Sequence, residues 1–232
     1  MMPPERKVWL VGGGGHAKVV LATFHACGWE VAGIFDTKPE IWGSRLFDVE
    51  IVGEVPDDHW WHSPGICGFL SIGSNTSRAH LATMLKSTRW ATIVHPSATV
   101  HSSVCLGPGT LVCAHAVVQP DARIGAHTIV NTAAVVEHDN QIGDFCHIGP
   151  RACLAGSTRV EEGVLVGAGA TVTPGIHLGA WSTIGAGAAV IEDVPEAVTA
   201  VGVPAHFRLG PSSIGHAIRE DRRPEDKLQG GV

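Results

Sequence analysis

An aliphatic side chain recurs at every sixth position from Val94 to Val190 without interruption. The seventeen positions are Val94, Val100, Leu106, Val112, Val118, Ile124, Val130, Val136, Ile142, Ile148, Leu154, Val160, Val166, Val172, Leu178, Ile184 and Val190. A small or β-branched residue usually follows four positions later, as at Ala98 and Thr110. A fixed six-residue period is the signature of a hexapeptide β-helix, in which each short strand points one aliphatic side chain inward. Because three hexapeptides complete one triangular coil, the pattern predicts an all-β parallel β-helix of five to six coils.

Residues 7–92 carry a different pattern, in which short apolar runs alternate with segments of helical spacing. The expected strands are KVWLVG (7–12), EVAGIFD (30–36) and ICGFLSIG (66–73). The expected helices are HAKVVLATFHACG (16–28) and NTSRAHLATMLKS (75–87), with Asn75 as the candidate N-cap of the second. Strands joined by crossover helices predict a parallel sheet with right-handed connections, here a half-Rossmann βαβαβ unit.

We therefore expect three parts: an α/β domain over 1–92, a β-helix domain over 93–194 and a C-terminal extension over 195–232. The last part of the extension, from residue 211, is polar and carries mixed charges, which is typical of a short helix or a frayed tail.

Composition excludes several classes of protein. Hydrophobic residues make up 44% of the 232 positions, so a sizeable core can be buried, while the net charge of −6 argues against binding to nucleic acid or an acidic membrane. No apolar run approaches the ~20 residues of a membrane span, and the N-terminal segment reaches a glycine turn too soon for a signal peptide. The six cysteines form no C-x-x-C pair and are best explained as small packing residues. These features favour a cytoplasmic protein.

The hexapeptides, the VGVPA segment at 201–205 and VGGGGHAKVV at 11–20 together resemble the left-handed β-helix acyltransferases. Within that group, the chain is similar to the branch with a nucleotide-binding domain in front: the PglD- and PerB-like nucleotide-sugar N-acetyltransferases and the NeuD-like sialic acid O-acetyltransferases. The resemblance implies a homotrimer, acetyl-CoA in the groove between adjacent prisms, and a front domain that holds the nucleotide of the acceptor sugar. It implies no metal cofactor.

The stretch EHDNQIGDFCH (137–147) contains the candidate catalytic residues. His138 occupies the third slot of its hexapeptide, where the side chain should point outward, and an imidazole is suited to take the proton of an attacking amine. Glu137 and Asp139 are the carboxylates near enough in sequence to fix its tautomer. The resemblance assigns the base to His138 and its orienting partner to Asp139. No serine or cysteine stands beside His138, which favours direct attack by the amine over an acyl-enzyme.

The resemblance also implies residues for binding both substrates. His147 would contact the acyl donor or the acceptor sugar, and Asn131 would lie near the amino sugar. Gly156 would offer its backbone N–H to the thioester oxygen, as acyl transfer requires. Ala168 and Ala186 would line the acetyl-CoA groove.

The front domain carries a candidate nucleotide site. Gly12, Gly14 and Ala17 match G-x-G-x-x-A, and Asp36 ends the second expected strand 22 residues after Gly14. Such glycines let a backbone approach a pyrophosphate at a helix N-terminus, and the acid takes ribose hydroxyls. Because only half of a dinucleotide domain is present, a nucleoside diphosphate sugar suits the site better than a nicotinamide cofactor.

We expect its pyrophosphate at Gly13, Gly14 and Gly15 and its base or ribose at Asp36. His16 would either donate to a phosphate or cap the turn. The segment GSNTSR (73–78) would either line the pocket or serve only as a capped helix start.

The sequence thus predicts an acetyl-CoA-dependent N-acetyltransferase that acts on the 4-amino group of a nucleotide-linked deoxy-aminosugar. Three alternatives remain at this point. The acceptor could be a hydroxyl of a sialic acid or another sugar, the prism could hold zinc as in carbonic anhydrases, or it could be a non-catalytic scaffold. Residues stacked 18 positions from His138 and His147 are not metal ligands, so a zinc site would need histidines from two subunits.

Overall fold

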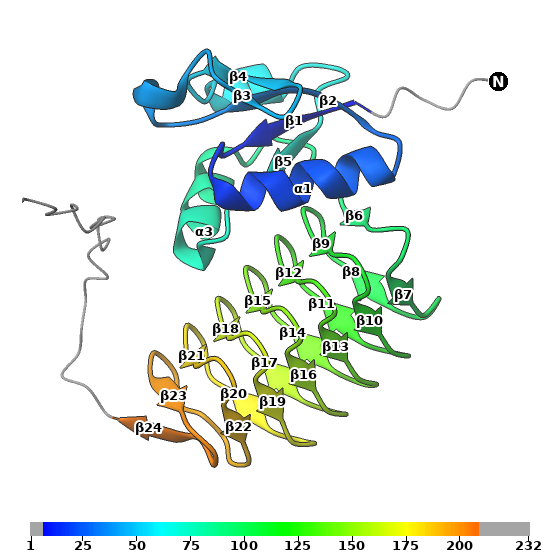
Figure 1. The fold of residues 1–232 in the computed structure, drawn as a ribbon, viewed down its shortest axis with the longest axis vertical. Coiled ribbons are helices and arrows are strands. Elements are labelled where there is room, and N and C mark those ends of the chain that lie inside the picture. Colours follow the sequence, from blue (N-terminus) through cyan, green and yellow to red (C-terminus); the bar gives the residue numbers. More distant parts are fainter. Residues whose placement is uncertain (1–6, 209–232) are drawn as a thin grey trace, which may run out of the picture.

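The computed structural model describes residues 7–208, and the expected structure from residue 211 onward lies outside the described residues. The chain folds into an α/β domain that sits at one end of a long β-helix (Figure 1). The longest helix within residues 7–208 has 12 residues, so none of the described helices reaches the ~20 residues that a bilayer span needs.

The α/β domain is built on a five-stranded sheet. Its strands are β1 (Lys7–Val11), β2 (Glu30–Phe35), β3 (Arg45–Leu46), β4 (Val49–Gly53) and β5 (Gly68–Leu70), in the order β3-β4-β2-β1-β5. Its helices are α1 (Gly15–Ala26), the 3-10 helix η1 (Pro39–Ile41), α2 (Asp58–Trp61) and α3 (Asn75–Met84). The three predicted strands, β2, β1 and β5, are parallel as expected. The sequence did not predict β4, which extends the parallel sheet beside β2 and forms an antiparallel hairpin with β3 at the edge.

The predicted cap of α3 is wrong by one residue. Ser74 is the N-cap, and its hydroxyl accepts a hydrogen bond from the Ser77 amide at 3.3 Å. Asn75 instead turns its side-chain amide toward the β-helix, where it donates to the carbonyls of Gly163 and Val164. Asn75 therefore binds the β-helix, and its side chain does not cap the helix as the local pattern had predicted.

The β-helix follows the six-residue frame. Each of the seventeen predicted inward residues is the second residue of a two-residue strand, from β6 (Ile93–Val94) to β22 (Ala189–Val190). From Val112 to Val190 these side chains are buried and form one continuous core. Each strand pairs in parallel with strands 18 positions away, as Ile129, His147 and Leu165 do in turn. The prediction of a parallel β-helix is confirmed.

The prism has three faces, which we name after the strands of one central coil. The β13 face contains β7 (Thr99–Val100), β10 (Val117–Val118), β13 (Val135–Val136), β16 (Cys153–Leu154), β19 (Thr171–Val172) and β22. The β14 face contains β8 (Cys105–Leu106), β11 (Arg123–Ile124), β14 (Gln141–Ile142), β17 (Arg159–Val160) and β20 (His177–Leu178). The β15 face contains β6, β9 (Leu111–Val112), β12 (Ile129–Val130), β15 (His147–Ile148), β18 (Leu165–Val166), β21 (Thr183–Ile184), β23 (Thr199–Val201) and the antiparallel β24 (His206–Arg208).

The corners of the β-helix share one backbone conformation. In every hexapeptide from Gly109 to Gly187, the third residue after the inward aliphatic has a positive φ, between 52° and 74°. Asp139 is one of these residues, with φ of 59°. The left-handed residue turns the chain from one face to the next and fixes the direction of the side chains beside it.

The α/β domain packs on the first coils of the β15 face. Val20, Leu21 and Phe24 of α1 share one buried cluster with Ile93 and Leu111. Figure 1 shows α1 lying across this end of the β-helix, next to β6 and β9. The buried contact holds the glycine loop that precedes α1 in a fixed place relative to the coils.

Candidate functional site

The glycine loop between β1 and α1 forms one wall of a large pocket. The pocket has a volume of about 1680 Å³, and its lining includes Gly12 to Gly15, His16, Asp36 and Gly73. Helix α1 begins at Gly15, and its N-cap Gly14 offers no side chain to bind the free amides. A helix N-terminus of this kind, open to a pocket, is suited to hold a phosphate group.

Gly13 is needed in this loop because the space beside it is already filled. A Cβ built on Gly13 would lie 2.8 Å from Cδ1 of Ile51, whereas one on Gly14 or Gly15 would meet nothing within 4 Å. The loop is therefore packed on one side and open to the pocket on the other.

Asp36 is nearly buried, with 8% of its surface exposed. Its Oδ2 accepts a hydrogen bond from the Gly13 amide at 2.6 Å, and its Oδ1 accepts one from the Lys38 amide at 2.9 Å. The carboxylate thus ties the glycine loop to the end of β2. Each oxygen keeps a further lone pair that a ribose hydroxyl can use.

His138 and Asp139 stand together on an outer edge of the β-helix. Nδ1 of His138 lies 2.7 Å from Oδ2 of Asp139, and both side chains are more than half exposed. If Nδ1 carries the proton, as this contact favours, Nε2 has a free lone pair and can act as a base.

Asn140 supports this corner, and the sequence pattern gave no sign of that role. The residue occupies a buried slot that the other hexapeptides fill with a small or β-branched residue. Its Nδ2 donates to the carbonyls of Glu137, at 2.7 Å, and Ala155, at 3.0 Å. These two bonds hold the turn that carries His138 against the next coil.

Gly156 lies directly beneath the ring of His138. A Cβ built on Gly156 would lie 2.6 Å from Cε1 and 2.7 Å from Nε2 of His138, so the ring rests on the bare Cα. The Gly156 amide donates no hydrogen bond within residues 7–208. Because this N–H has no partner among the described residues and belongs to the residue beneath the candidate base, it is a candidate donor to an oxyanion.

His147 lies on a different part of the prism from His138. Its Nε2 is 2.9 Å from the Asn131 side-chain amide, its Nδ1 is 3.3 Å from the Gly73 carbonyl, and its ring centroid is 6.0 Å from that of His16. Because His16 and Gly73 line the pocket, the structure places His147 and Asn131 at the junction between the pocket and the β-helix.

Burial shapes the protonation of this junction. Desolvation, together with the nearby charge of Arg78, lowers the pKa of both His16 and His147 to about 4, so both imidazoles are neutral at neutral pH. Nε2 of His16 is buried and has no hydrogen-bond partner among the described residues.

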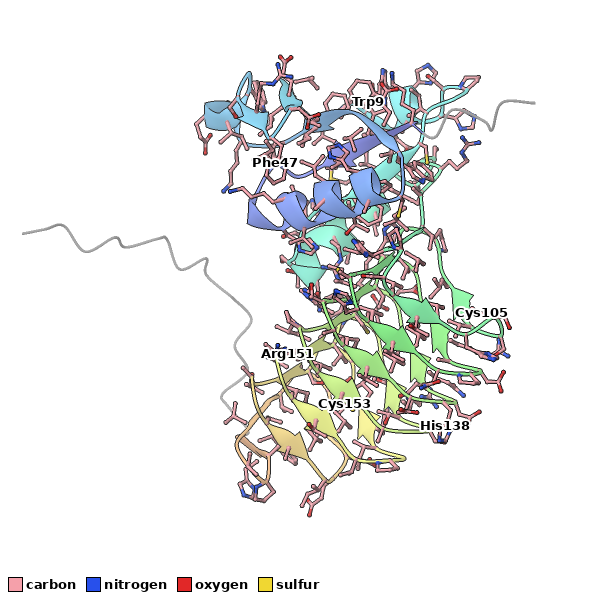
Figure 2. The ribbon with its side chains drawn as sticks, turned by 45° about the vertical axis from the view of Figure 1, so that its right-hand side comes forward. Trp9, Phe47, Cys105, His138, Arg151 and Cys153 are labelled. Atoms are coloured by element: carbon pink, nitrogen blue, oxygen red, sulfur yellow. The ribbon has the colours of Figure 1, made fainter. Side chains whose placement is uncertain are left out.

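Ala168 and Ala186 lie on the same edge of the prism as Asn131, where the chain passes from the β15 face to the β13 face. His138 and Gly156 lie on the next edge, beyond the β13 face. Figure 2 shows the two edges and the face between them: Arg151 marks the first edge, Cys153 the β13 face and His138 the second edge.

The predicted residues therefore fall into two groups within one chain. The pocket is lined only by residues between Gly12 and Lys86, so His138 does not reach it. Figure 2 shows His138 on the prism, away from the α/β domain that carries Trp9 and Phe47. Within residues 7–208, no three His, Cys, Asp or Glu side chains lie together as a metal site would require.

Comparison with known proteins gives the family. The profile of the PglD N-terminal domain matches residues 7–85, and that of the hexapeptide repeat of succinyl-transferase matches 140–174 and 157–191. An uncharacterized protein of Acanthamoeba polyphaga mimivirus is 32% identical over 109 residues, a match that spans 47% of this chain and only 21% of the viral protein.

Three solved structures share the whole architecture. PerB from Caulobacter crescentus, in complex with CoA and GDP-perosamine, is 40% identical, with a TM-score of 0.82 over 87% of this chain and 97% of that one. The acetyltransferase domain of PglB from Neisseria gonorrhoeae, in complex with acetyl coenzyme A, is 32% identical, with a TM-score of 0.80 over 88% and 100%. WeeI from Acinetobacter baumannii, at 21% identity and a TM-score of 0.77 over 87% and 100%, shares the fold. Identity above 30% over almost the full length of PerB and of the PglB domain means that the chain belongs to the PglD- and PerB-like family of left-handed β-helix acetyltransferases.

Proposed function

We propose that the protein transfers the acetyl group of acetyl-CoA to the 4-amino group of a nucleotide-linked deoxy-aminosugar, with His138 as the general base. The observation that carries the proposal is the His138–Asp139 pair above the free amide of Gly156. The complexes of PerB with CoA and GDP-perosamine and of PglB with acetyl coenzyme A support this choice of donor and acceptor.

The geometry provides for each part of an amide-forming reaction. The acceptor amine attacks the thioester carbon, and the developing oxyanion takes a hydrogen bond from the Gly156 amide. Nε2 of His138 removes the proton that the nitrogen loses, while Asp139 stabilises the imidazolium. Collapse of the intermediate breaks the C–S bond, and the imidazolium returns its proton to the departing thiolate. The products are the N-acetyl sugar and CoA.

The acceptor occupies the pocket of the α/β domain in this proposal. Its pyrophosphate lies at Gly13 to Gly15, its ribose or base lies near Asp36, and its sugar reaches the junction of His16, Asn131 and His147. Both nitrogens of His147 are already engaged, with Gly73 and Asn131, whereas Nε2 of His16 has no partner among the described residues and is the imidazole nitrogen left for a sugar hydroxyl. In this proposal His147, which the resemblance left on either the donor or the acceptor side, is assigned to the acceptor side.

The site is completed by a second copy of the chain. Because His138 stands on an outer edge of the prism, away from the α/β domain whose residues line the pocket, we infer that the base reaches the acceptor from a neighbouring subunit. The β13 face is suited to pack near a second prism, because its outward side chains are mostly small and apolar. They are Thr99, Val117, Val135, Cys153, Thr171 and Ala189. We propose a homotrimer with acetyl-CoA held between adjacent prisms, against Gly156, Ala168 and Ala186.

Replacement of His138 by alanine tests the proposal. The variant should keep its oligomeric state and lose roughly 10²- to 10⁴-fold in kcat with a GDP- or UDP-linked 4-amino sugar, since general base catalysis contributes about that much. Release of the CoA thiol measures the rate. An unchanged kcat would remove His138 as the base, and activity confined to sugars without an amine would favour O-acetylation.

A further inference from the structure

Arg78 on α3 is a buried cation that no carboxylate neutralises within the described residues. Only 1% of its surface is exposed, and it forms no salt bridge in residues 7–208. Its donors all go to neutral oxygens: the carbonyls of Ile72, Gly73, His127, Phe145 and Cys146, and the side-chain amide oxygen of Asn75. Burial lowers the pKa of Arg78 to about 10, so the side chain stays protonated at neutral pH.

These contacts join the wall of the pocket to three successive coils. Arg78 binds carbonyls at His127 and at Phe145 and Cys146, and Asn75 binds those of Gly163 and Val164. His127, Phe145 and Gly163 occupy equivalent corner positions, 18 residues apart.

On its other side, the guanidinium binds the carbonyls of Ile72 and Gly73, and both residues line the pocket. Gly73 also meets Nδ1 of His147. One side chain thus spans the pocket wall and the β-helix.

An arginine in this position needs an explanation, because a buried charge without a carboxylate partner costs free energy that a neutral side chain would not. The six acceptors satisfy all five N–H groups of the guanidinium, with one N–H of Nη2 shared, but leave its charge uncompensated. That charge acts on His16 and His147, the two imidazoles at the junction.

We propose that Arg78 is a positioning residue for the acceptor, which fixes the pocket-lining loop against the coils and places an unpaired charge beside the His16–His147 pair, since Arg78 and His147 bind the same Gly73 carbonyl. The inference rests on the proposed function, since it takes the junction as the place of the acceptor sugar. A neutral His147 can accept from the Asn131 amide at Nε2 while it donates to the Gly73 carbonyl from Nδ1, whereas a protonated ring would only donate and would lose the contact with Asn131.

The ionisable groups that face the pair come from few elements. Among the described residues, the groups whose charge acts on the pair are Arg78 from α3 and His16 itself, which acts on His147. Asp36, whose carboxylate binds two backbone amides, lines the same pocket as His16, and Cys146 beside Arg78 has its thiol pKa raised by burial to about 12. Asp144 acts on His127 and Cys146. Among these groups, Arg78 is the cation that lowers the pKa of both imidazoles of the pair.

Three variants separate the charge of Arg78 from its hydrogen bonds. Arg78→Gln removes the charge, Arg78→Lys keeps the charge but loses the planar set of donors, and Asn75→Ala weakens the contact with the coils while keeping the charge. NMR titration of the imidazole protons measures the pKa of His16 and of His147 in each variant without any substrate. The variants His16→Asn and His147→Asn assign the two resonances.

We expect the midpoints of His16 and His147 to rise in Arg78→Gln from about 4 toward the ordinary histidine value, which they do not reach because desolvation remains the larger cause. Arg78→Lys and Asn75→Ala should titrate like the wild type. All three should raise the KM for the nucleotide sugar by about tenfold, the equivalent of one or two lost hydrogen bonds, and leave the KM for acetyl-CoA unchanged.

Two results would overturn the proposal. The first is an Arg78→Gln protein whose two imidazoles titrate as in the wild type. The second is an acceptor KM that stays at the wild-type value in both Arg78→Lys and Asn75→Ala, and this comparison decides the matter if Arg78→Gln does not fold.

If the wild type acetylates no aminosugar nucleotide, the proposed function fails, while the titration and the affinity for GDP or UDP still test Arg78.

Discussion

Gly156→Ala is expected to slow acetyl transfer by moving His138 rather than removing it. The added Cβ would lie 2.6 Å from Cε1 of His138, and carbon atoms in ordinary contact stay about 3.4 Å or more apart. The ring therefore has to move by about 0.8 Å, or the corner has to open by that distance. Since Asn140 and the neighbouring strands hold the corner, the exposed ring is the part that moves.

The expected loss follows from this displacement. A general base acts within roughly 2.6–3.2 Å of the proton that it takes, and a misplacement of about 1 Å costs up to a hundredfold. We expect kcat to fall by about 10- to 100-fold, which corresponds to ~1.4 to 2.7 kcal/mol in the barrier. The KM for the nucleotide sugar should change little, because Gly156 lies outside the pocket. Steady-state release of the CoA thiol, with each substrate varied in turn, measures these constants.

A double-mutant cycle provides the control. In a His138→Ala background there is no ring for the new methyl group to displace, so adding Gly156→Ala should cost nothing further. If the second substitution lowered kcat by the same factor in both backgrounds, the effect would not act through His138, and the reasoning would be refuted. Retention of the backbone N–H in alanine keeps the proposed oxyanion contact equal in all four proteins.

Two further variants test the buried histidine and the pocket. The ring of His127 stacks on Phe145, and burial lowers its pKa to about 4. The neutral ring therefore contributes its full stabilisation above pH 6.5, and that stabilisation is lost as the pH falls toward 4. The free energy of unfolding should fall by about 2 kcal/mol at pH 5 for this reason. His127→Phe keeps the stacking and has no group to titrate. In urea unfolding, the free energy of unfolding of the variant minus that of the wild type should therefore increase from pH 7 to pH 5. A difference independent of pH would contradict the linkage. Asp36→Ala frees the amides of Gly13 and Lys38 and should raise the KM for the nucleotide sugar alone, whereas a parallel rise in the KM for acetyl-CoA would show that the two substrates do not bind separately.

The β-helix could be predicted from the sequence almost residue by residue, because its core depends on a fixed period. Every predicted inward residue from Val94 to Val190 occupies the second position of a strand. The outward direction of His138 follows from the same frame. In the α/β domain, β1, α1, β2, β5 and α3 were predicted to within a few residues, because each has an apolar run or a helical spacing.

Other features could not be predicted, because they depend on contacts between segments far apart in sequence. The hairpin of β3 and β4 has no alternation long enough to stand out, and β3 contains only Arg45 and Leu46. Arg78 would be placed on a solvated helix face by any local rule, yet the corners of the β-helix bury it. The approach of His16 to His147 joins residues 131 positions apart, and no periodicity records it.

The eighteen-residue coil is also the unit in which this protein can change length. Because each strand pairs with strands 18 positions away, inserting one whole coil would leave every later side chain on its face, whereas inserting a single hexapeptide would rotate all later coils by one face. Arg78 and Asn75 span the corners from His127 to Val164, so a coil inserted there would break the bridge. In evolutionary terms, the prism has a segment of fixed length beside the α/β domain and, beyond the proposed acetyl-CoA groove, an end that is free to grow by whole coils.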